Sequence, residues 1–149
     1  MSAEGSVTAL PHDAPMQPRD LDWLAQPGCH LLVVGDPRYP AALREVAQAP
    51  PVLYVQGDPD WLGLPQLAVV GSRNASPQGL ENARAFAAEL ARRGLAITSG
   101  LALGVDGAAH RGALEAGGGT VAVCGTGLDR VYPARHRELA HAIAAHGAL

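Results

Sequence analysis

A unit of short apolar strand, glycine-containing loop and helix recurs after residue 66, and this recurrence constrains the fold more than any other feature. The strands are expected at 67–70, 95–98 and 120–124, and the helices at 77–93, 105–116 and 135–146. Strands that are apolar throughout and alternate with amphipathic helices are typical of a parallel sheet covered on both faces. Because crossovers in such a sheet are right-handed, we expect a doubly wound, Rossmann-like α/β fold.

Three segments of different character organise the chain. Residues 1–20 lack the basic start and the apolar stretch of a signal peptide, and we expect a flexible tail there. Residues 21–62 form a predicted N-terminal extension of strand, short helix and strand, with the elements at 30–34, 41–47 and 51–57. Glycines and prolines from residue 57 onwards predict a linking turn into the Rossmann-like core, residues 63–149.

The two helices nearest the middle of the chain carry clear end signals. Ser76 is the expected N-cap of the first helix, Pro77 suits its first position, and Gly94 ends it. A buried stripe is predicted for that helix, at Leu80, Ala83, Phe86, Ala87 and Leu90. Asp106 is the expected N-cap of the second helix.

Composition narrows the class of protein. Of the 149 residues 48% are hydrophobic, no apolar run approaches a membrane span, and the two cysteines are unpatterned, as expected of a cytoplasmic protein. The net charge is −3, yet residues 67–149 hold eight arginines against six acidic groups. Lysine is absent, which excludes a P-loop.

Three glycine loops are expected to meet at one edge of the sheet, because ligands of open α/β sheets bind beyond the carboxyl ends of the strands. The loops are "GSRNAS" (71–76), "SGLALGVD" (99–106) and "GTGLDRVYP" (125–133). Their glycines, hydroxyls and one arginine suit a phosphate, and the candidates are Gly71, Ser72, Arg73, Ser99, Gly100 and Gly125. A dinucleotide site is disfavoured, because "GTGLDR" has arginine where the third glycine of that motif belongs.

The sequence allows two interpretations of the pair Asp106 and His110. His110 follows Asp106 by one helical turn, which suits either a metal or acid–base pair or a helix cap beside a buried histidine. The second is favoured on general grounds. His136, His141 and His146 recur every five residues and do not share one helix face, so we expect no metal site.

Four blocks resemble, in order and spacing, the signatures of the DNA-processing protein A (DprA, or Smf) family. They are "YPAALREVAQAPPVLYVQGD", "LAVVGSRNASPQG", "ITSGLALGVDGAAHRGAL" and "GGTVAVCGTGLDRVYPARHREL", and they run from Tyr39 to Leu139. The resemblance implies a protein of DNA uptake and natural transformation that binds and protects incoming single-stranded DNA and assists RecA loading. It also implies a Rossmann-like fold, a homodimer, and neither catalysis nor a cofactor.

The resemblance also implies a site. Gly71, Ser72 and Arg73 would hold a DNA phosphate, Ser99 and Gly100 would line the same pocket, and Arg135 of "YPARH" would add a cationic contact. Gly125 lies in the third loop, and Tyr132 is the candidate for stacking on a base. Leu103 stands where some relatives carry a basic or polar side chain.

The chain ends at "AHGAL", before the family's domain does, which implies a C-terminally truncated fragment and a sheet incomplete at its C-terminal edge. Two alternatives stay open beside DNA binding. One is an enzyme of the nucleoside-monophosphate phosphoribohydrolase type, although the glutamate of its "PGGxGTxxE" block is missing and the nearest is Glu138. The other is an inactive fragment.

Overall fold

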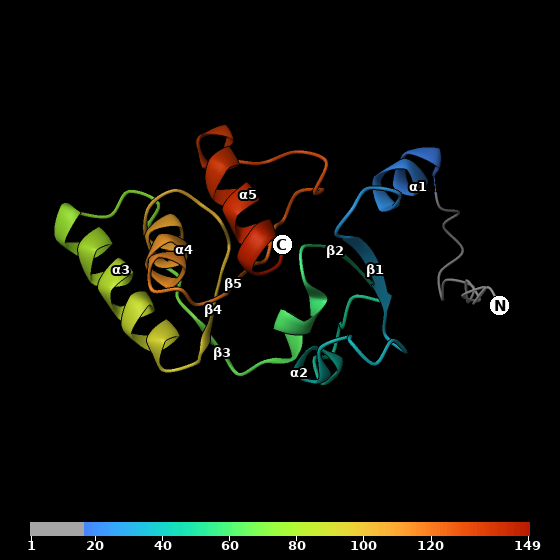
Figure 1. Ribbon diagram of the computed structural model, residues 1–149, viewed down its shortest axis with the longest axis horizontal. Coiled ribbons are helices and arrows are strands. Elements are labelled where there is room, and N and C mark those ends of the chain that lie inside the picture. Colours follow the sequence, from blue (N-terminus) through green and yellow to red (C-terminus); the bar gives the residue numbers. More distant parts are fainter. Residues whose placement is uncertain (1–16) are drawn as a thin grey trace.

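The computed structural model describes residues 17–149, so most of the tail expected over residues 1–20 lies outside the described residues. Helix α1 (Pro18–Leu24) begins inside that range. Beyond it the chain divides into an N-terminal hairpin region and a three-stranded parallel sheet with its helices (Figure 1). None of the described helices has the length and apolar character that crossing a bilayer requires.

The N-terminal region contains two antiparallel strands, β1 (Cys29–Val33) and β2 (Val52–Gln56), with the short helix α2 (Ala41–Arg44) between them. These elements confirm the strands and the helix expected there. Their core centres on Leu32, Tyr39 and Val55, and the buried Tyr39 hydroxyl donates to the Pro50 carbonyl at 2.7 Å. That bond satisfies the one polar group of the ring, which packs in an apolar cluster and has the Arg44 guanidinium 5.8 Å from its centroid.

A short 3₁₀ helix, η1 (Pro59–Gly63), leads into the parallel sheet, where the sequence predicted a linking turn. The strands β3 (Gln66–Ala68), β4 (Ala96–Ser99) and β5 (Thr120–Ala122) pair in chain order. Gln66 lies opposite Ala96, and Ile97 lies opposite Thr120. Parallel strands linked by helices confirm the predicted α/β, Rossmann-like class.

Three crossover helices form one layer on this sheet (Figure 1). They are α3 (Pro77–Arg92), α4 (Val105–Glu115) and α5 (Arg137–His146), the last preceded by a 3₁₀ turn, η2 (Ala134–His136). Helix α4 packs against both α3 and α5. Strands added in one direction by right-handed crossovers place their helices on the same face. This accounts for the common layer of α3, α4 and α5, and the short helix η1 contacts β5 as well.

Helix α3 confirms its predicted ends and its predicted stripe except at Phe86, because Leu80 and Leu90 are half-buried and Ala83 and Ala87 are buried. The Ser76 hydroxyl caps it by accepting from the Gly79 N–H at 3.1 Å. Its buried residues are Ala83, Ala87 and Ala91, whereas Phe86 is 68% exposed and the expectation that it is a core residue was wrong. The reason is close packing: α3 and α4 meet through alanines and Gly112, and no space remains for a phenyl ring.

The last residues join the two sheets. Ala148 donates to the Thr120 carbonyl at 3.1 Å and accepts from the Ala122 N–H at 2.8 Å, so it pairs parallel with β5. Leu149 exchanges two hydrogen bonds with Gln56 of β2, at 2.8 and 3.0 Å. Ala148 and Leu149 thus form a short extended segment between β5 and β2, at the edge where the sequence predicted an incomplete sheet.

Candidate nucleic-acid interface

The three glycine loops leave β3, β4 and β5 at the same edge of the sheet, because the strands are parallel. The first loop packs on the start of α4. The Val105 N–H donates to the Ser72 carbonyl at 3.1 Å, and Gly104, at φ +81°, lies so close that a Cβ there would be 2.1 Å from the same carbonyl oxygen. Glycine at position 104 therefore serves both a left-handed backbone and a close approach.

The exposed groups of the first loop are those that suit a phosphate. Ser72 Oγ accepts from the Asn74 N–H at 3.1 Å, which shapes the turn and leaves the hydroxyl hydrogen available. Arg73 is exposed and takes part in none of the ion pairs of residues 17–149. Gly71 packs against Val105, where a Cβ would lie 2.9 Å from a methyl carbon. The loop thus presents a hydroxyl and a guanidinium from a fixed backbone.

The second loop uses its donors internally. Ser99 is buried, and its hydroxyl donates to the Val69 carbonyl at 2.6 Å. The Gly100 and Ala102 N–H groups donate to the Asp106 carboxylate at 3.1 and 3.4 Å. Two donors that the sequence offered to a phosphate are therefore already engaged, and Ser99 and Gly100 act in this arrangement by holding the loop.

The sequence suggested that Asp106 is the N-cap of α4, and this was wrong: Gly104 occupies that position. Asp106 is the second helical residue and is buried, with its carboxylate turned back over the loop. The partial positive charge of a helix N-terminus favours an anion there. In α4 the protein's own carboxylate supplies it.

Replacing Asp106 by asparagine should lower the free energy of unfolding by about 1 kcal/mol, because a neutral amide oxygen accepts more weakly than a carboxylate. Urea unfolding followed by circular dichroism measures the change. Asp129 is exposed and makes only a surface pair with Arg130 at 3.8 Å. The matched control Asp129→Asn should stay within about 0.5 kcal/mol. Equal effects of the two substitutions would show that Asp106 does not hold the loop.

The third loop and the turn η2 that follows it are exposed at the residues predicted to contact DNA. Gly125 and Arg135 are exposed, and Arg135 forms no ion pair within residues 17–149. Tyr132 is 71% exposed, so its ring does not pack under the loop. A flat aromatic surface of this kind is what stacking on a base requires.

His136 ties the third loop to the second, a role that sequence reasoning missed. It is buried, and its Nδ1–H donates to the Leu101 carbonyl at 2.8 Å. A Cβ on Gly107 would lie 2.6 Å from the imidazole Cε1. Only glycine fits beneath the ring, so Gly107 was the one feature of the sequence that could have indicated this contact. The bond fixes the segment that carries Arg135 relative to the second loop.

His110 resolves the histidine question in favour of a structural role. It is fully buried, and its Nδ1 lies 2.7 Å from Thr120 Oγ1, which itself donates to the Ile97 carbonyl at 2.5 Å. Nδ1 therefore carries the proton, and burial lowers the pKa of His110 to about 4. Within residues 17–149 no group of three histidine, cysteine or acidic side chains is placed to hold a metal ion.

Comparison with known proteins identifies a family model and several relatives that match this chain. The family model of DNA recombination-mediator protein A matches residues 30–149. Protein Smf of Escherichia coli (strain K12) is 44% identical over 127 residues, which cover 85% of this chain and 34% of that protein. DNA processing protein DprA of Streptococcus pneumoniae (strain R6) is 46% identical over 104 residues, 70% of this chain and 36% of that protein.

Two solved structures share the fold. The X-ray structure of DprA from Streptococcus pneumoniae superposes with a TM-score of 0.78 at 38% identity, over 87% of this chain and 45% of that one. DNA processing protein A from Helicobacter pylori, described for its single-stranded DNA binding mode, gives 0.70 at 31% identity, over 80% and 54%. This chain spans about a third of the length of the Escherichia coli and Streptococcus pneumoniae proteins. It belongs to the DNA recombination-mediator protein A family.

Proposed function

We propose that this chain binds single-stranded DNA through its phosphates, as a module of DNA uptake and natural transformation. Family membership supports this, as does the single-stranded DNA binding of the Helicobacter pylori relative. The observation that carries the proposal is the first loop. Ser72 and Arg73 are exposed there, the arginine outside every ion pair of the described residues, on a backbone fixed against α4.

Contacts of this kind bind without reading bases. The Ser72 hydroxyl and the Arg73 guanidinium would hold one phosphate beside Gly71, and Gly125 and Arg135 would meet the strand at the third loop. Phosphate contacts fix the position of a nucleic acid but carry no sequence information. Tyr132 would stack on a base, a contact that tolerates every base. Ser99 and Gly100 would support the site by holding the second loop in place.

The proposal extends to the protein's setting. We propose binding without catalysis, because the two side chains best suited to acid–base chemistry are occupied: Asp106 accepts from two backbone groups and His110 is buried and neutral. Protection of incoming DNA, assistance to RecA loading, a homodimer and a cytoplasmic location complete the proposal, on the family resemblance.

The test is fluorescence anisotropy of a labelled oligothymidine at several salt concentrations. Arg73→Ala should weaken binding and lower the slope of log K against log salt by about one unit, because one phosphate contact is lost. Arg93→Ala is the matched control. Arg93 is also exposed, but it follows the far end of the 16-residue helix α3 and pairs with Glu89 at 2.8 Å. That substitution should leave the affinity unchanged.

Equal affinities of Arg73→Ala and the unsubstituted chain would remove the first loop from the site. Absence of binding at low salt, by a chain whose circular dichroism shows the expected helices, would contradict the proposed function as a whole. Equal weakening by Arg73→Ala and Arg93→Ala would indicate binding by net charge alone.

A further inference from the structure

Four exposed arginines around helix α4 have no partner within residues 17–149. They form neither an ion pair nor a side-chain hydrogen bond there: Arg73, Arg111, Arg135 and Arg137. Arg73 and Arg135 belong to the candidate site described above. Arg111, on α4, and Arg137, the first residue of α5, do not, and we call these two the α4–α5 arginines.

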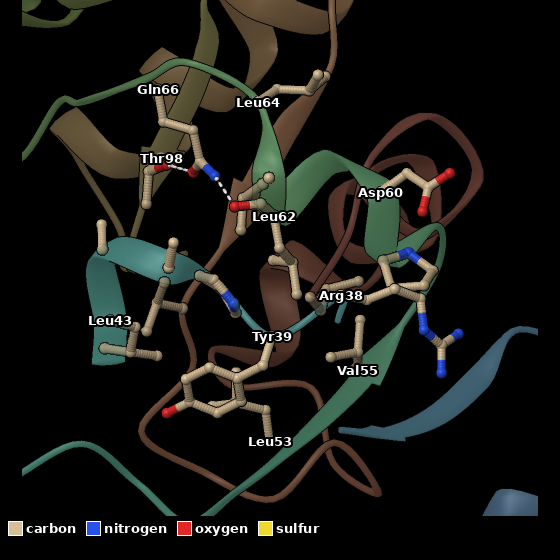
Figure 2. A pocket seen from close by; sticks show the side chains of 18 of the residues that line it. Arg38, Tyr39, Leu43, Leu53, Val55, Asp60, Leu62, Leu64, Gln66 and Thr98 are labelled. Atoms are coloured by element: carbon tan, nitrogen blue, oxygen red, sulfur yellow. Dashed lines mark hydrogen bonds between the residues drawn. The ribbon is translucent and has the colours of Figure 1, made fainter. Parts of the chain in front are cut away.

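Most other arginines are engaged. Each of the following binds an acidic side chain or a backbone carbonyl: Arg38, Arg44, Arg84, Arg92, Arg93 and Arg130. Arg38 and Arg44 line the pocket shown in Figure 2, and Asp36 holds both of them, at 3.0 and 2.6 Å. Arg19 in α1 is the remaining arginine without a partner in residues 17–149. Guanidinium groups open to a ligand are therefore concentrated around α4.

Helix α4 brings Arg111 close to the first loop. Gly104, Gly107 and Arg111 follow at spacings of three and four residues, so they share one face of the helix. A Cβ on Gly104 would lie 2.8 Å from the carbonyl carbon of Arg73, and a Cβ on Gly107 would lie 3.1 Å from Nη1 of Arg111. The Arg111 side chain thus reaches back one turn towards the helix start. Its guanidinium lies about 5 Å along the axis from the level of the Arg73 backbone.

Gly107 also carries the segment that contains the other two arginines. The imidazole Nε2 of His136 lies 2.8 Å from the same Cβ position that Arg111 Nη1 approaches. Arg135 and Arg137 flank His136 in the chain, so their backbone lies beside the second turn of α4. One small residue therefore lets the guanidinium of α4 and the start of α5 come together.

Stability alone does not account for cations at these places. Arg135 and Arg137 lie at the start of α5, where the helix dipole favours acidic side chains such as Glu138. Arg111 lies one turn before Glu115 on α4, but that carboxylate is already paired with α3 at 2.6 Å. Residues that depart from the local rules of stability are expected at functional sites. Unpaired guanidinium groups on one surface are typical of a site for an anion.

We propose that the α4–α5 arginines, Arg111 and Arg137, bind a second phosphate of the same DNA strand that the first loop holds. The inference rests on the proposed DNA binding and extends it. The strand would run from Arg73 along the glycine face of α4, beside Arg135, instead of staying at the loop edge of the sheet. A guanidinium holds a phosphate through paired hydrogen bonds, and the contact carries no base identity.

The test is anisotropy of a labelled oligothymidine at several salt concentrations, with Arg111→Ala beside Arg73→Ala. Arg111→Ala should weaken binding roughly tenfold, as for the loss of one hydrogen bond to a charged group. It should also lower the slope of log K against log salt by about one unit, and the double variant should lower it by about two. Arg137→Ala should act like Arg111→Ala.

Arg19→Ala is the matched control. Arg19 is also exposed, helical and without a partner in residues 17–149, but it belongs to α1. Its loss should leave the affinity and the slope unchanged. Circular dichroism should show the same helices in every variant, because each substituted side chain is exposed.

The outcomes separate this inference from the proposed function. Weakening by Arg73→Ala but not by Arg111→Ala would overturn the second phosphate position and leave DNA binding at the first loop intact. Equal weakening by Arg19→Ala and Arg111→Ala would overturn it as an effect of net charge. A double variant with the slope of Arg73→Ala would show that both arginines hold one phosphate. Absence of binding at low salt by the folded chain would overturn the inference together with the proposed function.

Discussion

Gly112→Ala is expected to lower the free energy of unfolding by about 3 kcal/mol, the upper part of the range for overpacked cores. A Cβ at position 112 would lie 2.1 Å from the carbonyl oxygen of Arg84 and 2.9 Å from its carbonyl carbon. Both are backbone atoms of α3, which no side-chain rotation can move. The two helices would have to separate, and the contacts of Ala87 with Ala109 and Ala113 would lengthen. Urea unfolding followed by circular dichroism measures the loss.

Gly79→Ala is the matched control, because it makes the same change inside a helix without a backbone obstacle. A Cβ there would meet only side chains, the nearest being Ser76 Oγ at 3.4 Å. Alanine is a better helix former than glycine, so this variant should gain up to about 1 kcal/mol. Unchanged stability of Gly112→Ala, with a gain at Gly79→Ala, would contradict the close approach of α3 and α4.

Much of the fold could be predicted from the sequence, because its signals are local. The cap at Ser76, the proline that follows it and the glycine loops each act within a few residues, and the structure places the elements accordingly. Phe86 was misplaced because its burial depends on how closely α3 approaches α4, which no periodicity records. The extended segment of residues 147–149 is too short to show a strand periodicity in the sequence. It becomes visible only through its partners in β5 and β2.

The position of the candidate site could be predicted from the sequence, but the hydrogen bonds within it could not. Glycine loops after parallel strands located Ser72 and Arg73 at the loop edge. The partners of Ser99 and Asp106 could not be predicted, because a hydroxyl or carboxylate near several backbone groups chooses among them by tertiary geometry. The bond from His136 to Leu101 spans 35 residues. Contacts of that separation leave no trace in a helical or strand period.

The buried imidazole of His110 predicts a pH dependence of stability. Its pKa in the folded chain is about 4, against an ordinary value of 6.5. Between these two values the unfolded chain binds a proton that the folded chain does not, so stability falls as the pH is lowered. The difference in pKa corresponds to about 3 kcal/mol of stability. The free energy of unfolding should fall by that amount between pH 7 and pH 4, and His110 should contribute no pH dependence above pH 7. Urea unfolding at intervals across this range measures it.

His110→Gln should remove that part of the pH dependence, because glutamine does not titrate and its amide can still donate to Thr120. His141→Gln makes the same change at an exposed position of α5 and should leave the profile as it was. The difference between the two variants isolates His110 from the carboxyl groups that titrate in the same range. Identical profiles would mean that the His110 imidazole reaches water in the folded chain.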